Sequence, residues 1–240
     1  MKPQSSWAFN IDGAALFYAF SQQLLITFNF VENTIILAAV YGPKAISGRK
    51  ENPECAIVEV IWKPKTGIAG SNEREAEFIV KRTLEHIILT AMHPNTAISV
   101  IIQVVNDDGG ALACAMNAAC AALVDAGVPL SGLIAAVTCA VDKEGMVFLD
   151  PMKKEEKDFR GHACLVFPGR PLAATSAASL AIDNEPIEHG IVSSVTKGAL
   201  SADDYLNCLE RGRAASAKIA EFARSSLERA QRGVEMVVAS

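Results

Sequence analysis

The chain has 240 residues, of which 50% are apolar and 20% charged, with 22 lysines and arginines against 27 aspartates and glutamates. This composition excludes a disordered chain, a coiled coil and a collagen-like repeat, because each of these needs a different residue bias. A net charge of −5 also argues against a protein that binds nucleic acid over its whole surface. Any such binding must use a local basic patch or a partner's charge.

The cysteine and histidine spacings are not those of a zinc site, since the sequence has neither a C-x-x-C nor an H-x-x-x-H pair. Most cysteines stand in apolar runs such as 113–115 and 138–140, so we expect small buried side chains and a reducing compartment. The apolar stretch 14–41 is interrupted by polar residues. It lacks the run of about 18 apolar residues of a membrane helix, and we expect core strands and no membrane association.

From residue 34 onward, strands and helices are predicted to alternate. The pattern predicts strands at 34–41 and 55–62, an amphipathic helix at 73–92 and a buried strand at 96–105. Asn72 and Glu75 are the predicted capping box of that helix.

The second half of the chain continues the alternation. The predicted elements are a small-residue helix at 111–126, hairpin strands at 133–141 and 146–149, strands at 163–167 and 191–196, and a long helix opened by Ser201. No linker-like change of composition divides the chain. We therefore expect one α+β domain with mixed β-sheet layers covered by three main helices.

The turn 107–110, Asp-Asp-Gly-Gly, is the first feature that could carry chemistry. Glycines between a strand and a helix let the backbone approach a ligand, and the free amides of the helix favour an anion such as phosphate. A tight turn that serves packing alone is the alternative.

The acidic cluster at 150–156 is the second feature. Asp150, Glu155 and Glu156 could bind Mg²⁺, which activates water or stabilises a leaving oxygen in phosphodiester chemistry. Because lysines are interleaved with these acids, a solvated charged loop is the alternative.

Basic residues are the third feature. Side chains that could contact RNA phosphates are Lys63, Lys65, Arg74, Lys81 and Arg82. Neighbouring glutamates allow the alternative that these are ordinary surface charges.

Taken together, ordered segments within about 34–229 resemble the RNase PH family of 3′-to-5′ exoribonucleases and exosome ring subunits. The segments that carry the resemblance are 37–44, 59–67, 80–84, 93–96, 107–110, 117–127, 165–168 and 189–191. The resemblance implies an RNase PH-like domain over 34–232, a divergent amino-terminal segment 1–33 of uncertain role and a C-terminal tail 233–240.

One departure from the family concerns phosphate. Catalytic members carry Gly-Gly-Thr-Arg or Gly-Gly-Ser-Arg at the turn, where these residues hold inorganic phosphate. Here Gly109, Gly110 and Ala111 are the remnant of that site, and Leu112 stands in place of the arginine. Without the guanidinium, we expect phosphorolysis to be inefficient. The aspartate pair of active members is matched by Asp150 and Glu156.

The resemblance leaves two functional hypotheses open. In the first, which we favour, the chain is a non-catalytic or weakly catalytic exosome ring subunit that binds single-stranded RNA and other RNase PH-like subunits. It would act in RNA degradation and processing, rRNA maturation included, in the nucleus, nucleolus and cytoplasm, and could form a homodimer in isolation.

The second hypothesis is an active Mg²⁺-dependent 3′-to-5′ exoribonuclease, hydrolytic rather than phosphorolytic. Asp150 and Glu156 would be catalytic, and Lys65 and Arg82 would hold the strand. A small-molecule kinase that binds nucleotide at Gly109 and Gly110 is less favoured, because the longer glycine-rich phosphate loop of such enzymes is missing.

Overall fold

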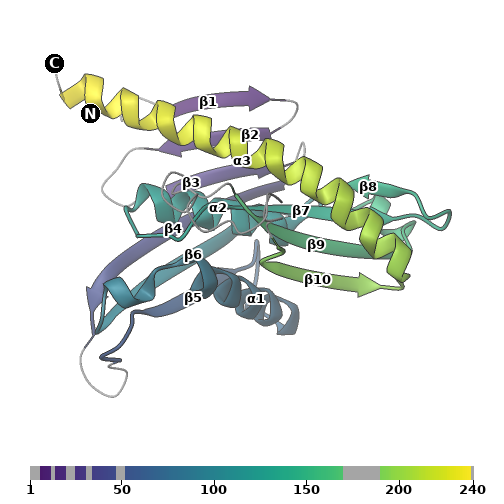
Figure 1. The fold of residues 1–240 in the computed structure, drawn as a ribbon, viewed down its shortest axis with the longest axis horizontal. Helices are drawn as coiled ribbons and strands as arrows, with labels where there is room; N and C mark the ends of the chain where they lie inside the picture. Colours follow the sequence, from purple (N-terminus) through teal and green to yellow (C-terminus); the bar gives the residue numbers. More distant parts are fainter. Residues whose placement is uncertain are drawn as a thin grey trace, which may run out of the picture.

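The computed structural model describes residues 6–11, 14–19, 25–30, 34–46, 52–169 and 190–238. In these residues, three α-helices pack with two β-sheets (Figure 1). This confirms the predicted α+β class, with mixed sheets and three main helices.

The first sheet has six strands. Their spatial order is β1 (Ser6–Ile11), β2 (Ala14–Ala19), β3 (Leu25–Phe30), β4 (Thr34–Ala45), β6 (Thr96–Asn106) and β5 (Ile57–Lys63). All neighbours are antiparallel except β5 and β6, which are parallel because α1 (Ser71–Ile87) connects them. The strands expected within 14–41 are therefore present.

The second sheet has four antiparallel strands. Their order is β10 (Ser193–Gly198), β9 (Gly161–Pro168), β7 (Ile134–Val141) and β8 (Val147–Leu149). The predicted hairpin joins β7 to β8, and the Asp142 N–H donates to the Met146 carbonyl at 3.0 Å.

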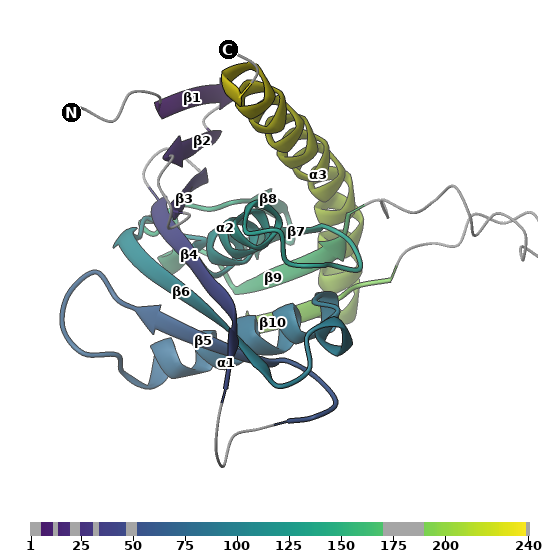
Figure 2. The same cartoon turned by 90° about the vertical axis from the view of Figure 1, so that its left-hand side faces the viewer.

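Helix α2 (Ala111–Asp125) lies between the two sheets, whereas α3 (Ala202–Val238) covers the other face of the four-stranded sheet (Figure 2). Every residue of α2 from Ala113 to Leu123 is buried, as the lack of charge in this helix predicts. Asn117 makes a polar link between α2 and the second sheet. Its Nδ2 donates to the Ala136 carbonyl at 2.9 Å, and its Oδ1 accepts the Ala136 N–H at 2.8 Å.

Two apolar clusters follow from these layers. The larger joins the first sheet, α1, α2 and one face of the second sheet, and the smaller joins the opposite face of the second sheet to α3. All six cysteines are free, and all except the half-buried Cys55 are buried, as expected from their apolar neighbours.

Helix α1 differs from its prediction at both ends. It ends at Ile87 instead of residue 92, because Ile88 is extended and bridges to Leu130, and a 3₁₀ turn follows at Thr90–Met92. Its N-cap is Gly70, whose N–H donates to the Glu73 carboxylate at 2.9 Å. The predicted cap of Asn72 with Glu75 is therefore wrong by two residues.

The structure continues past the predicted domain boundaries at residues 33 and 233. The strands of segment 1–33 belong to the same sheet as β4, and α3 runs to Val238, into the predicted tail 233–240. Residues 1–5, 12–13, 20–24, 31–33 and 239–240 lie outside the described residues. Among the helices that the structure describes, none is both long and apolar enough to cross a bilayer.

Candidate functional site

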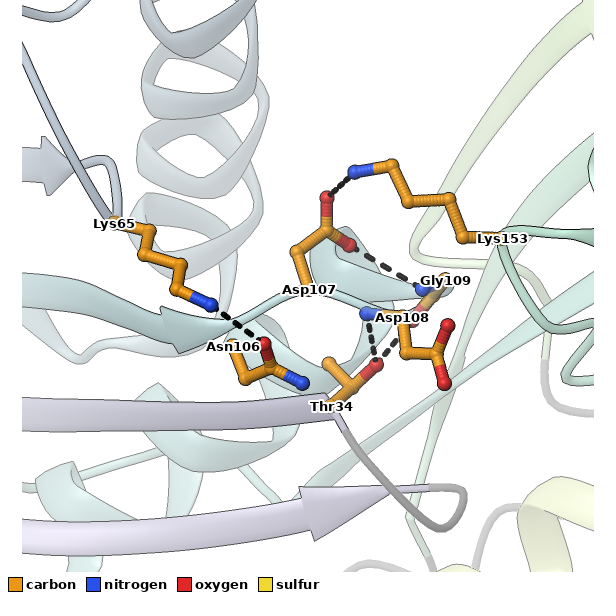
Figure 3. A network of polar contacts seen from close by, with 7 residues as sticks. All are labelled: Thr34, Lys65, Asn106, Asp107, Asp108, Gly109 and Lys153. Carbon is orange, nitrogen blue, oxygen red and sulfur yellow. Dashed lines mark hydrogen bonds and ion pairs between the residues drawn. The ribbon is translucent and has the colours of Figure 1, made fainter.

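The turn 107–110 connects β6 to α2 and is fixed by the first residue of β4. Gly109 has a φ of +114° and Gly110 a φ of +62°, a region that residues with a Cβ rarely adopt. The buried Thr34 hydroxyl accepts the Asp108 N–H at 3.0 Å and donates to the Gly109 carbonyl at 2.8 Å (Figure 3). One side chain thus holds two consecutive residues of the turn.

The loop after β8 closes on this turn from the other side. The Lys153 backbone N–H donates to the Asp108 carbonyl at 2.6 Å, and its ammonium forms an ion pair with the Asp107 carboxylate (Figure 3). The other Asp107 oxygen accepts the Gly109 N–H at 3.3 Å. A Cβ on Gly109 would lie 2.3 Å from the Pro151 carbonyl oxygen, so this close approach requires glycine.

A groove of about 420 Å³ opens beside the turn, between α1, the ends of β5 and β6 and the first residues of α2. Its apolar lining residues are Trp62, Ala76, Ile79, Val104, Ala111 and Leu112. Its charged lining residues are Lys65, Lys153, Lys197, Glu73, Glu75 and Asp107. Among the described lining residues, the three positive charges equal the three negative charges in number.

Each groove lysine has a polar partner inside the chain. Lys65 donates to the Asn106 side-chain oxygen at 2.9 Å (Figure 3), and the Lys197 ammonium lies 3.9 Å from the Glu75 carboxylate. The hydrogen bond to Asp107 raises the pKa of Lys153, so this side chain stays protonated at neutral pH.

Asp150 lies directly after β8, and its carboxylate faces the second sheet. It accepts the Thr138 N–H at 3.2 Å, while its own N–H donates to the Thr138 carbonyl at 2.7 Å. Burial raises the pKa of Asp150 to about 6, and the Thr138 hydrogen bond opposes the shift. Burial, and then the Asp150 charge, also raise the pKa of Cys164 on β9.

The other predicted metal ligands lie in the 3₁₀ turn Glu155–Lys157. The Glu155 carboxylate accepts the Met152 N–H at 3.1 Å. Within the described residues there is no group of three or more His, Cys, Asp or Glu side chains placed to hold a metal ion, so Asp150, Glu155 and Glu156 do not form one. Mg²⁺ often uses one or two carboxylates plus substrate phosphates, so binding at Asp150 and Glu156 stays a prediction.

The predicted RNA-binding residues come from the end of β5, the loop after it and α1. Of Lys63, Lys65, Arg74, Lys81 and Arg82, only Lys65 lines the groove. Lys63 ends β5, and the other three lie on α1. Lys81 and Arg82 lie 3.8 and 3.7 Å from Glu85, and the Arg82 guanidinium stands 5.3 Å from the centre of the Phe78 ring.

Sequence reasoning missed four polar residues of this site, which are Thr34, Asn106, Lys153 and Lys197. Lys153 belongs to the charged cluster 150–156, but nothing in the pattern separates it from Lys154. Lys197 lies on β10, far along the chain from the turn. Only pairing of distant strands brings it to the groove.

Comparison with known proteins shows which family the chain belongs to. Residues 28–129 match the model of the 3′ exoribonuclease family, domain 1. An exosome complex exonuclease RRP46 homolog of Arabidopsis thaliana is 50% identical over 196 residues, which cover 82% of each chain. The chain belongs to the RNase PH family. The family match spans β4 to α2, with the turn 107–110, but ends before Lys153 and Lys197.

Further relatives agree with this assignment. The RRP46 homolog of Oryza sativa is 49% identical over 82% of each chain, and the exosome component Rrp41 of Archaeoglobus fulgidus is 28% identical over 81% of this chain and 73% of its own. The crystal structure of rice Rrp46 matches with a TM-score of 0.73 at 43% identity and covers 93% of both chains. The RNase PH-like fold inferred from the sequence is confirmed.

Proposed function

We propose that this chain is a ring subunit of an RNA exosome, which holds single-stranded RNA beside other RNase PH-like subunits and lacks efficient phosphorolysis. The observation that carries the proposal is Leu112. It lines the groove at the start of α2, where the catalytic members of the family described above have an arginine for inorganic phosphate. An isobutyl group cannot replace the paired donors of a guanidinium.

The names of the relatives support the assembly part of the proposal. Those from Arabidopsis, rice and Archaeoglobus fulgidus are each described as an exosome complex protein. A subunit in such a ring would serve 3′-to-5′ RNA processing and degradation, rRNA maturation included, in the nucleus, nucleolus and cytoplasm.

Assembly is tested by co-expressing the chain with other RNase PH-like exosome subunits. We expect a stable complex on size-exclusion chromatography, and light scattering on the isolated chain would show whether it forms a homodimer. A chain that stays monomeric and ignores every such subunit would overturn the ring assignment.

Phosphorolysis is tested with 5′-labelled single-stranded RNA, Mg²⁺ and the purified chain, with and without inorganic phosphate. We expect no phosphate-dependent shortening. Shortening that requires phosphate would show that Ala111 and Leu112 still support phosphorolysis.

A hydrolytic Mg²⁺-dependent exoribonuclease is the second candidate. Two observations favour it: the plant relatives are described as exonucleases, and Asp150 precedes the loop that closes on the groove turn. In the same assay without phosphate, Asp150→Asn and Glu156→Gln should each abolish shortening if these residues are catalytic. Loss of activity in both variants would reject the non-catalytic hypothesis, and an inactive wild type would reject the enzyme.

A further inference from the structure

We propose that the groove discriminates between phosphate species: it binds the singly charged phosphodiester of single-stranded RNA through Lys153 and excludes free inorganic phosphate. This inference rests on the proposed function and deepens it, because it names the anion that the groove accepts and the residue that binds it.

Lys153 supplies the cation that residue 112 does not. Its backbone N–H is held by the Asp108 carbonyl at 2.6 Å, and its ammonium reaches Asp107, so backbone and side chain are both fixed beside the start of α2. The first amides of a helix favour an anion. A lysine in that position is a point charge, which can attract one phosphate oxygen but cannot form the paired hydrogen bonds of an arginine.

The charge balance of the groove sets the preferred ligand charge. Among the lining residues that the structure describes, Lys65, Lys153 and Lys197 are opposed by Glu73, Glu75 and Asp107, so these residues carry no net positive charge. A phosphodiester carries a single negative charge, whereas inorganic phosphate near neutral pH is partly divalent. A lining without excess positive charge compensates neither anion, so the doubly charged ion has the larger unfavourable desolvation free energy.

The apolar lining favours a nucleotide over a bare ion. Ile79, Val104 and Leu112 offer apolar surface beside Lys153 in the same groove. A ribose or base can bury apolar atoms against these side chains, while inorganic phosphate has no apolar surface to bury. Leu112 thus offers apolar surface to a nucleotide, and it stands in place of the arginine that would bind inorganic phosphate.

Asp107 limits the strength of this site. An incoming anion must compete with the Asp107 carboxylate for the Lys153 ammonium, which also feels the negative charges of Glu156 and Asp108. Asp107→Asn would remove the hydrogen-bonded competitor and leave the described lining residues with three lysines against two carboxylates. We expect this variant to bind RNA more tightly and to accept inorganic phosphate as well.

The experiment measures fluorescence anisotropy of a labelled uridine oligonucleotide with the full chain, at constant ionic strength and without divalent ions. We expect Lys153→Gln to weaken binding roughly tenfold, the effect of losing one charged contact. Lys154→Gln is the matched control, because Lys154 follows in the same exposed loop but does not line the groove. It should leave the affinity unchanged.

Competition with inorganic phosphate gives the second readout. For the wild type, the fraction of RNA bound in millimolar phosphate should equal the fraction bound in chloride at the same ionic strength. It should displace RNA from Leu112→Arg and from Asp107→Asn. Circular dichroism and thermal melting of each variant establish that it is folded. A variant that is not folded is replaced by Lys153→Arg. This variant should bind RNA, but inorganic phosphate should displace that RNA.

The outcomes separate this inference from the proposed function. If the wild type binds RNA but Lys153→Gln and Lys154→Gln bind equally, or if phosphate displaces RNA from the wild type, the inference is wrong and RNA binding by the chain stands. If the wild type binds no RNA, either by itself or within a ring, the proposed function fails with it.

Discussion

Thr34 and Gly109 lie 75 positions apart in the chain, yet the Thr34 hydroxyl donates a 2.8 Å hydrogen bond to the Gly109 carbonyl. The same oxygen accepts the Asp108 N–H, so the start of β4 fixes the turn that leads into α2. The loop after β8 holds that turn through Lys153. Residues that follow or begin strands of both sheets therefore hold this turn in place beside the groove.

Thr34→Val tests the role of this hydroxyl. Valine keeps the shape of threonine but loses both hydrogen bonds in a buried position, so the free energy of unfolding should fall by about 2 kcal/mol. Urea denaturation measures the change. Thr34→Ser should recover most of it, and a valine variant as stable as the wild type would show that the two hydrogen bonds contribute nothing.

Gly109→Ala and Gly110→Ala should differ in severity. At Gly109 the new Cβ meets the Pro151 carbonyl oxygen at 2.3 Å, whereas at Gly110 its nearest neighbour is the Thr138 hydroxyl at 3.3 Å. We expect losses of about 3 kcal/mol or more at Gly109 and about 1 kcal/mol at Gly110, where the left-handed conformation is the main cost. Thermal unfolding compares them, and equal losses would contradict the close approach of the two loops.

Asn117→Leu tests the polar link between α2 and β7. Leucine has the same number of side-chain heavy atoms with the same branching at Cγ, but both hydrogen bonds to the Ala136 backbone are lost inside the core. We expect about 3 kcal/mol of destabilisation, since buried backbone groups lose their partners. The measurement is again denaturant unfolding, with Met116→Leu as a nearby control that preserves packing volume. If both variants lose the same small amount, the hydrogen bonds do not anchor α2.

Asp150 should make the free energy of unfolding fall as pH rises, whereas a carboxylate in an ion pair makes it rise. Burial raises the pKa of Asp150 from 3.8 to about 6, so between these values the native state binds a proton that the unfolded state does not. The free energy of unfolding therefore falls as pH rises from about 4 to about 6 and is constant above that range.

Asp150→Asn should remove this dependence, because asparagine can still accept the Thr138 N–H but does not ionise. Relative to the wild type, we expect up to about 3 kcal/mol of added stability near pH 7 and no gain near pH 4. Denaturant unfolding in the presence of a chelator at the two pH values measures it. A gain of equal size at both would show that the charge of Asp150 is not the cause.

Element types were readable from the sequence where the local pattern was strong. The continuous β-branched run of β6 and the uncharged small residues of α2 predict a buried strand and a buried helix without knowledge of their neighbours. The end of α1 was not readable in this way. Its apolar spacing continues past Ile87, but Ile88 instead pairs with Leu130, a contact that local periodicity does not contain.

For the candidate site too, some features follow from the sequence and others only from the tertiary structure. By itself the sequence determined the glycine turn at 107–110, because the turn depends on residue types at consecutive positions. The resemblance to the RNase PH family then identified Leu112 as the position where catalytic members have an arginine. Only the tertiary structure decided that Lys65, Lys153 and Lys197 share one groove while Lys81 and Arg82 pair with Glu85 on α1. The physical reason is that lysines and arginines look alike along a chain, and pairing of distant strands and packing of helices determine which of these charges meet.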